Sequence, residues 1–114
     1  MAVRGILRAL SILVMVMASV ATVQAEDLPT FHVTAKNGRL EPAQLRIPAG
    51  RRVKLQLHNA GPGPVEFESL PMHIEKVLTQ GATSFVVLPA LAPGRYEFVD
   101  EFHMETGRMQ VIAE

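Results

Sequence analysis

The sequence predicts an all-β sandwich or small barrel of about seven or eight short antiparallel strands, preceded by an N-terminal signal peptide. Three observations predict this class. Apolar and polar residues alternate with a period of two in several short segments, and turn residues separate these segments every 8 to 12 positions. No segment after the first 25 residues has a convincing helical period.

The N-terminal segment has the order of a secretory signal peptide. Arg4 and Arg8 precede an apolar run without acidic residues (9–21), and a small-residue sequence then ends at Ala25. The run is about 13 residues long, whereas a helix needs roughly 20 to cross a bilayer, so a retained membrane anchor is the less favoured alternative. We expect cleavage after Ala25, which leaves a periplasmic domain of residues 26–114.

The remaining chain is a single small domain. Removing 25 residues from 114 leaves 89, which is enough for one core. Because Arg4 and Arg8 leave with the signal peptide, this part carries 9 basic and 11 acidic side chains, so we expect no nucleic-acid partner. The chain has no cysteine, which excludes disulfides and thiolate metal ligands.

The expected strands follow one another along the chain as short alternating runs. The clearest lies at 51–59, where Val53, Leu55 and Leu57 face one way and the intervening polar residues face the other. Between the strands, 36–38, 60–64 and 91–94 read as turns, and 69–78 is irregular with at most a turn of helix near Leu70 to Val77. The expected strands are 31–35, 51–59, 65–69, 82–90, 95–100 and 108–114, with the extended stretch 43–50 leading into the second.

The strand at 95–100 ends in an unusual way. Tyr96 and Phe98 continue an inward-facing row, and the next residue of the same parity is Asp100. Glu101 and His103 follow at once. An inward carboxylate needs a partner or a metal ion, so we regard this strand end as a candidate metal site.

The order of the segments resembles a known family. The stretches "PAQLRIPAGRRVKLQLHNAGPGPVEF", "LAPGRYEFVDEFH" and "GRMQVIAE" resemble the cupredoxins, and most closely the EfeO-type cupredoxin-like domains of bacterial high-affinity iron uptake. The resemblance covers essentially all of residues 26–114. It implies a cupredoxin-like Greek-key β-sandwich, a bound metal ion, and partners that include an inner-membrane iron permease and other periplasmic iron-uptake components.

The sequence departs from the blue-copper members of that family at the metal ligands. Those proteins place a cysteine where Asp100 stands and a histidine three residues later, which His103 matches. Their upstream histidine falls near Val65 in this chain. A type 1 copper site needs a thiolate and two imidazoles, so this chain cannot form one.

Carboxylates stand in place of the missing soft ligands. A set rich in oxygen with one imidazole suits iron, manganese or Cu(II) better than Cu(I). Met72 and His73 are softer, weaker candidates. For Glu66 and Glu68 the alternative is a solvated surface role, because their parity is opposite to that of the apolar residues beside them. The candidate metal ligands are Glu66, Glu68, Asp100, Glu101 and His103.

The function that we expect is metal binding in iron acquisition. The protein would capture or oxidise ferrous iron, directly or through a bound copper ion, so the cofactor is iron or copper and a ferroxidase-like activity stays open. Two alternatives remain: a periplasmic copper carrier or sensor that uses Met72, His73 and His103, and a metal-free binding module. The chain has no cysteine nucleophile, and its serines lie in no triad-like context.

The signal-peptide interpretation gives a first prediction. Intact-mass analysis of the exported protein is expected to yield a chain that begins at Glu26, because the small-residue sequence ending at Ala25 is the cleavage site. A membrane-bound form that still contains residues 1–25 would show instead that the segment is an anchor.

Overall fold

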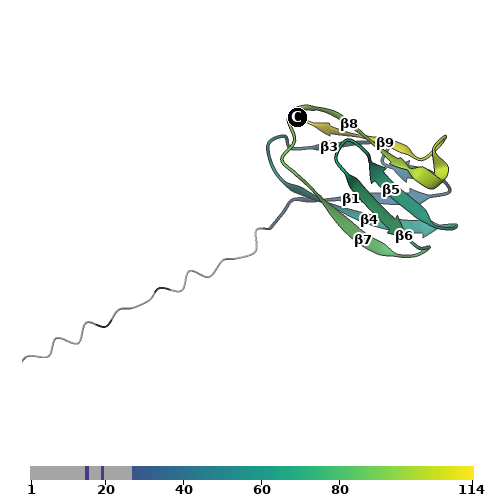
Figure 1. The fold of residues 1–114 in the computed structure, drawn as a ribbon, viewed down its shortest axis with the longest axis horizontal. Coiled ribbons are helices and arrows are strands. Elements are labelled where there is room, and N and C mark those ends of the chain that lie inside the picture. Colours follow the sequence, from purple (N-terminus) through teal and green to yellow (C-terminus); the bar gives the residue numbers. More distant parts are fainter. Residues whose placement is uncertain (1–14, 16–18, 20–26) are drawn as a thin grey trace, which may run out of the picture.

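The computed structural model describes residues 27–114 together with Met15 and Ser19, so the expected signal peptide and its cleavage point lie outside the described residues. Residues 30–113 form a β-sandwich of two sheets (Figure 1). The elements in chain order are β1 Thr30–Lys36, β2 Arg39–Glu41, β3 Gln44–Ile47, β4 Val53–Gly61, β5 Val65–Ser69, β6 Ile74–Leu78, β7 Thr83–Leu88, β8 Gly94–Asp100, the 3₁₀ turn η1 Glu101–His103, and β9 Arg108–Ala113.

The two sheets combine antiparallel and parallel pairing. One sheet has the order β2-β1-β4-β7 and the other β3-β9-β8-β5-β6. β1 runs parallel to β4 and β3 runs parallel to β9, so the expectation of purely antiparallel pairing is wrong at these two places. The reason is that neither pair is joined by a hairpin: β2 and β3 lie between β1 and β4 in the chain, and β4 to β8 lie between β3 and β9.

The predicted all-β class is confirmed, with nine strands in the described part of the chain. The additional strands are short, and β2 has only three residues. Between Leu70 and Val77, where the sequence allowed at most a turn of helix, the structure has a hydrogen-bonded turn and then a strand. The backbone N–H of His73 donates to the carbonyl of Leu70 to close a turn, and β6 then pairs with β5 from Ile74 onward.

Alternating side chains from both sheets form the core. Val53, Leu55 and Leu57 of β4 are all at most 2% exposed, as their period of two predicts. From the other sheet, the rings of Phe67 and Phe98 stack with their centroids 4.9 Å apart. Among the described residues, no helix is long and apolar enough to cross a membrane.

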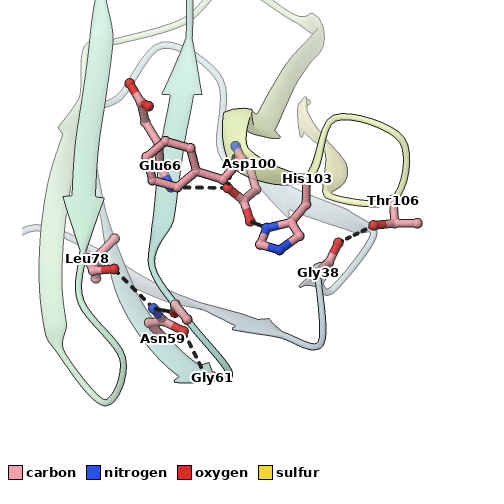
Figure 2. Close-up of polar contacts among 10 residues, drawn as sticks. Gly38, Asn59, Gly61, Glu66, Leu78, Asp100, His103 and Thr106 are labelled. Atoms are coloured by element: carbon pink, nitrogen blue, oxygen red, sulfur yellow. Dashed lines mark hydrogen bonds and ion pairs between the residues drawn. The ribbon is translucent and has the colours of Figure 1, made fainter.

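A buried asparagine closes the end of the sandwich where β4 ends. The side-chain amide of Asn59 donates to the carbonyl oxygens of Gly63 and Leu78 at 2.8 and 3.0 Å. Its side-chain oxygen accepts from the backbone N–H of Gly61 at 2.9 Å (Figure 2). Asn59 is 1% exposed, so these three bonds satisfy backbone groups that water does not reach easily.

Replacing this side chain is expected to destabilise the fold. Asn59→Ala would leave buried donors and acceptors unpaired, and we expect the free energy of unfolding to fall by about 3 kcal/mol. His58→Ala, at the exposed neighbouring position, is the control and is expected to change it by less than about 0.5 kcal/mol. Urea denaturation measures both, and equal stability of the two variants would contradict a structural role for Asn59.

Candidate metal centre

Asp100, the last residue of β8, has protein partners on both carboxylate oxygens (Figure 2). Oδ1 accepts hydrogen bonds from the backbone N–H groups of Glu66 and Phe102, both at 3.1 Å. Oδ2 lies 2.6 Å from Nδ1 of His103. Asp100 is 1% exposed, so the inward carboxylate predicted from the sequence is real, and its partners belong to the protein itself.

The loop that follows β8 closes tightly over Asp100. Backbone hydrogen bonds of 2.7 Å join Asp100 N–H to the carbonyl of Gly107, and Gly107 N–H to the carbonyl of His103. A Cβ atom at position 107 would lie 2.7 Å from the Cβ of Asp100, closer than real Cβ atoms come, so only glycine fits there. Asp100 also caps η1 and thereby fixes where Glu101 begins its turn.

Three of the predicted ligands meet on the outer face of the five-stranded sheet. One carboxylate oxygen each from Glu66, Glu68 and Glu101 lies within 4.8 Å of the other two. Glu66 and Glu68 alternate with Val65 and Phe67, whose side chains point into the core. Although it lies on the outer face, Glu68 is only 9% exposed, because neighbouring elements cover it.

A fourth carboxylate, Glu75, adjoins this group. In the β5–β6 hairpin Glu75 lies directly opposite Glu68, so both side chains occupy the same face. Glu75 is not among the ligands predicted from the sequence, because residues 69–78 show no regular alternation there. Pairing this stretch with β5 as a hairpin places Glu75 opposite Glu68. We call Glu66, Glu68, Glu75 and Glu101 the carboxylate group.

Mutual proximity makes two of these acids hold their protons unusually tightly. Hydrogen bonding with Glu75, followed by partial burial and the charge of Glu101, raises the pKa of Glu66 from 4.5 to about 7. Hydrogen bonding with Glu101, followed by burial and the charges of Glu101 and Glu75, raises the pKa of Glu68 from 4.5 to about 6. Carboxylates this close share protons, because ionising all of them would cost electrostatic free energy.

The structure thus divides the predicted ligands into two sets. Glu66, Glu68 and Glu101 come together, whereas Asp100 and His103 pair with each other. The two sets are linked through Glu66, whose backbone N–H binds Asp100 while its side chain joins the carboxylate group.

The two softer candidates lie outside both sets. The side chain of Met72 packs against the core. His73 is exposed and occupies the left-handed region of the turn before β6, with φ of 53°. Neither residue belongs to the group of three carboxylates.

The residues at the end of β8 do not fit a type 1 copper ion. Such a site needs a thiolate and two imidazoles, and no cysteine occurs in the chain. The oxygens of Asp100 are already bonded by the protein, and His103 supplies the only imidazole in that network. Val65, near which a second imidazole would be needed, is a buried core residue.

Comparison with solved structures identifies the same fold in an auracyanin and in a domain of a Cu(I)-exporting ATPase. Auracyanin from Roseiflexus castenholzii superposes with a TM-score of 0.63 at 12% identity, covering 78% of this chain and 99% of that one. The metal-binding domain of the Cu(I)-exporting P-type ATPase CopA from Streptococcus pneumoniae gives 0.64 at 19% identity, covering 80% and 91%. At these identities the likeness establishes the fold.

Comparison of sequences identifies the family. The uncharacterized protein RP394 of Rickettsia prowazekii (strain Madrid E) is 29% identical over 87 residues, which is 76% of this chain and 70% of that protein. The model of the cupredoxin-like domain family matches residues 8–113. With the two-sheet sandwich described above, this match over nearly the whole length shows that the chain belongs to the cupredoxin-like domain family.

Proposed function

We propose that this protein binds a metal ion in the periplasm and captures ferrous iron for an iron permease of the inner membrane. The observation that carries the proposal is the approach of the Glu66, Glu68 and Glu101 oxygens to within 4.8 Å of one another. None of the ion pairs found in the described part of the chain involves a member of the carboxylate group. A bound cation would turn the repulsion among these acids into attraction.

The chemistry of the donors favours a hard cation. Carboxylate oxygens bind iron and manganese well, and they bind Fe(III) more tightly than Fe(II). Fe(II) held by these groups therefore has a lowered reduction potential, and it loses one electron more readily to an acceptor such as Cu(II), which would be reduced to Cu(I) as Fe(II) becomes Fe(III). Capture is the first step of the proposal, and oxidation by such an acceptor is its extension.

The choice of iron and of a permease partner draws on the resemblance to EfeO-type domains. That resemblance lies in residues 42–67, 91–103 and 107–114, which include β3, β4, β8, β9 and part of β5, and it associates this kind of domain with iron uptake. The periplasmic location draws on the signal-like N-terminal segment. The loop that carries Glu101 lies at the end of the sandwich away from Thr30, where the chain enters β1 (Figure 1). An ion bound there would be accessible to a partner.

Metal ions are expected to stabilise the protein through the carboxylate group. An ion that binds only the folded state adds about 2.7 kcal/mol when its free concentration is 100 times its Kd, so Tm should rise with Fe(II) under anaerobic conditions and with Mn(II). Glu68→Gln and Glu101→Gln each remove one charged ligand and should lose most of this rise. Calorimetric melting at a series of ion concentrations measures it.

Glu105→Gln is the matched control, because Glu105 is an exposed acid of the same loop and lies outside the group. It should keep the rise. An unchanged rise in Glu68→Gln would remove the metal from this site. Stabilisation by Cu(I) alone would favour the copper carrier, and the absence of stabilisation by any of the three ions would favour the metal-free binding module.

The raised pKa values predict that the metal-free protein loses stability as pH rises. Glu66 and Glu68 have folded pKa values of about 7 and about 6, above the ordinary 4.5. The unfolded chain releases these protons first, so their contribution is complete below about pH 4.5 and disappears as pH rises through 6 and 7. Tm should therefore fall across this range, and less steeply in Glu66→Gln.

Glu114→Gln is the comparison for this prediction, because Glu114 lies in an exposed ion pair with Arg46 and outside the carboxylate group. The difference in Tm between each variant and the wild type, followed from pH 4.5 to pH 8, isolates the contribution of the substituted acid. Parallel curves for Glu66→Gln and the wild type would show that Glu66 has no raised pKa.

A further inference from the structure

We propose that β8 is a docking strand: an extended segment of a partner protein, alternating basic and apolar residues, pairs with its free edge and places an apolar side chain in the cavity beside it. This inference goes beyond the proposed function, because it needs no bound metal. Three features of the described residues carry it.

The first feature is a half-paired strand. β9 pairs with β8 along its length, from Gly94 to Val99. On the other side β5 pairs with β8 at two positions only, where Phe67 faces Asp100 and Glu68 faces Val99. Residues 94–98 therefore have a neighbouring strand on one side, and their other edge is free. A free edge is a template for an added strand, whose main-chain hydrogen bonds supply affinity.

The second feature is a cavity that keeps this edge open. A cavity of about 390 Å³ lies between β8 and the turn after β5, within the size range of ligand pockets. Its walls include Leu70 and Met72 from the turn, Tyr96 from β8, and Met104 from the loop after η1. Leu70 and Met104 are 75% and 43% exposed, so apolar surface borders the free edge and is uncovered in the monomer.

The third feature is the charge around the cavity, which determines what kind of partner segment fits there. Glu68 and Glu97 also line the cavity, and the rest of the carboxylate group adjoins Glu68. Arg95 also lines the cavity and keeps its charge, because Gln110, to which it donates at 2.9 Å, is neutral, and Arg108 offsets Glu97 by pairing with it at 2.7 Å. The excess negative charge therefore comes from the carboxylate group, whose members form none of the ion pairs found in the described part of the chain. A second copy of the chain would bring acids against acids, whereas a basic segment is complementary.

Strand geometry gives the pattern of that segment. Along β8, Tyr96 faces the core side and Arg95 and Glu97 face the outer side. Side chains of an added strand alternate in the same way. One face of the added strand therefore meets the apolar wall of Met72 and Tyr96, and the other lies on the same side of the sheet as the carboxylate group, so apolar and basic residues should alternate.

The test uses synthetic peptides and the metal-free protein. The peptide acetyl-Lys-Val-Lys-Leu-Lys-Val-Lys-amide should bind, with the largest changes in ¹⁵N NMR amide shifts at residues 94–98. A peptide with the same side chains but alternate backbone N-methyl groups cannot form one row of main-chain hydrogen bonds, and it should bind at least about tenfold more weakly. The same loss is expected when glutamate replaces lysine.

Matched variants locate the contact. Leu70→Ser removes exposed apolar surface at the cavity and should weaken binding about fivefold. Phe85→Ser is the control, because Phe85 is 51% exposed on β7 of the opposite sheet, and it should leave binding unchanged. Equal binding of the N-methylated peptide, or shift changes that centre on Phe85, would overturn the proposal. Because no metal is present, neither result bears on the carboxylate group as a metal site.

Discussion

The buried carboxylate of Asp100 holds together the segments from which the candidate site is built. It accepts hydrogen bonds from the backbone of β5 at Glu66 and of η1 at Phe102, and it pairs with the ring of His103. Hydrogen bonds to a buried charge are strong, and the low exposure of Asp100 keeps water from competing for them. The place of Glu101 relative to β5 follows from these contacts.

This fixed backbone explains how like charges remain close together. On a mobile loop, Glu101 would move away from Glu66 and Glu68. Here Asp100 caps η1 and Gly107 closes the loop behind it, so the acids reduce their repulsion by keeping protons. The raised pKa values of Glu66 and Glu68 follow from this proximity. A cation would therefore meet donors whose positions are already set by the fold.

The alternation of inward and outward residues along the strands, or strand parity, accounts for most of what the sequence could predict. It placed the core residues of β4, and it placed Asp100 on the inward row of β8. Strand parity gives no information beyond the end of a strand. It could not show that, in the 3₁₀ turn, the carboxylate of Glu101 joins Glu66 and Glu68 while His103 pairs with Asp100. Nor could it find Glu75. The β6 segment is an edge strand with weak alternation, and the position of Glu75 depends on the length of the turn before it.

The carboxylate group and the free edge of β8 have a common structural origin. β5 leaves β8 after the pair formed by Glu68 and Val99, and the turn from Leu70 onward leads the chain into β6 instead. That early departure exposes the edge of residues 94–98 and opens the cavity beside it. Glu68 lies where the two features meet, because its side chain belongs to the carboxylate group and also lines the cavity. A cation held by Glu68 would neutralise part of the charge that attracts a basic segment to β8, so metal binding and docking of such a segment would oppose each other.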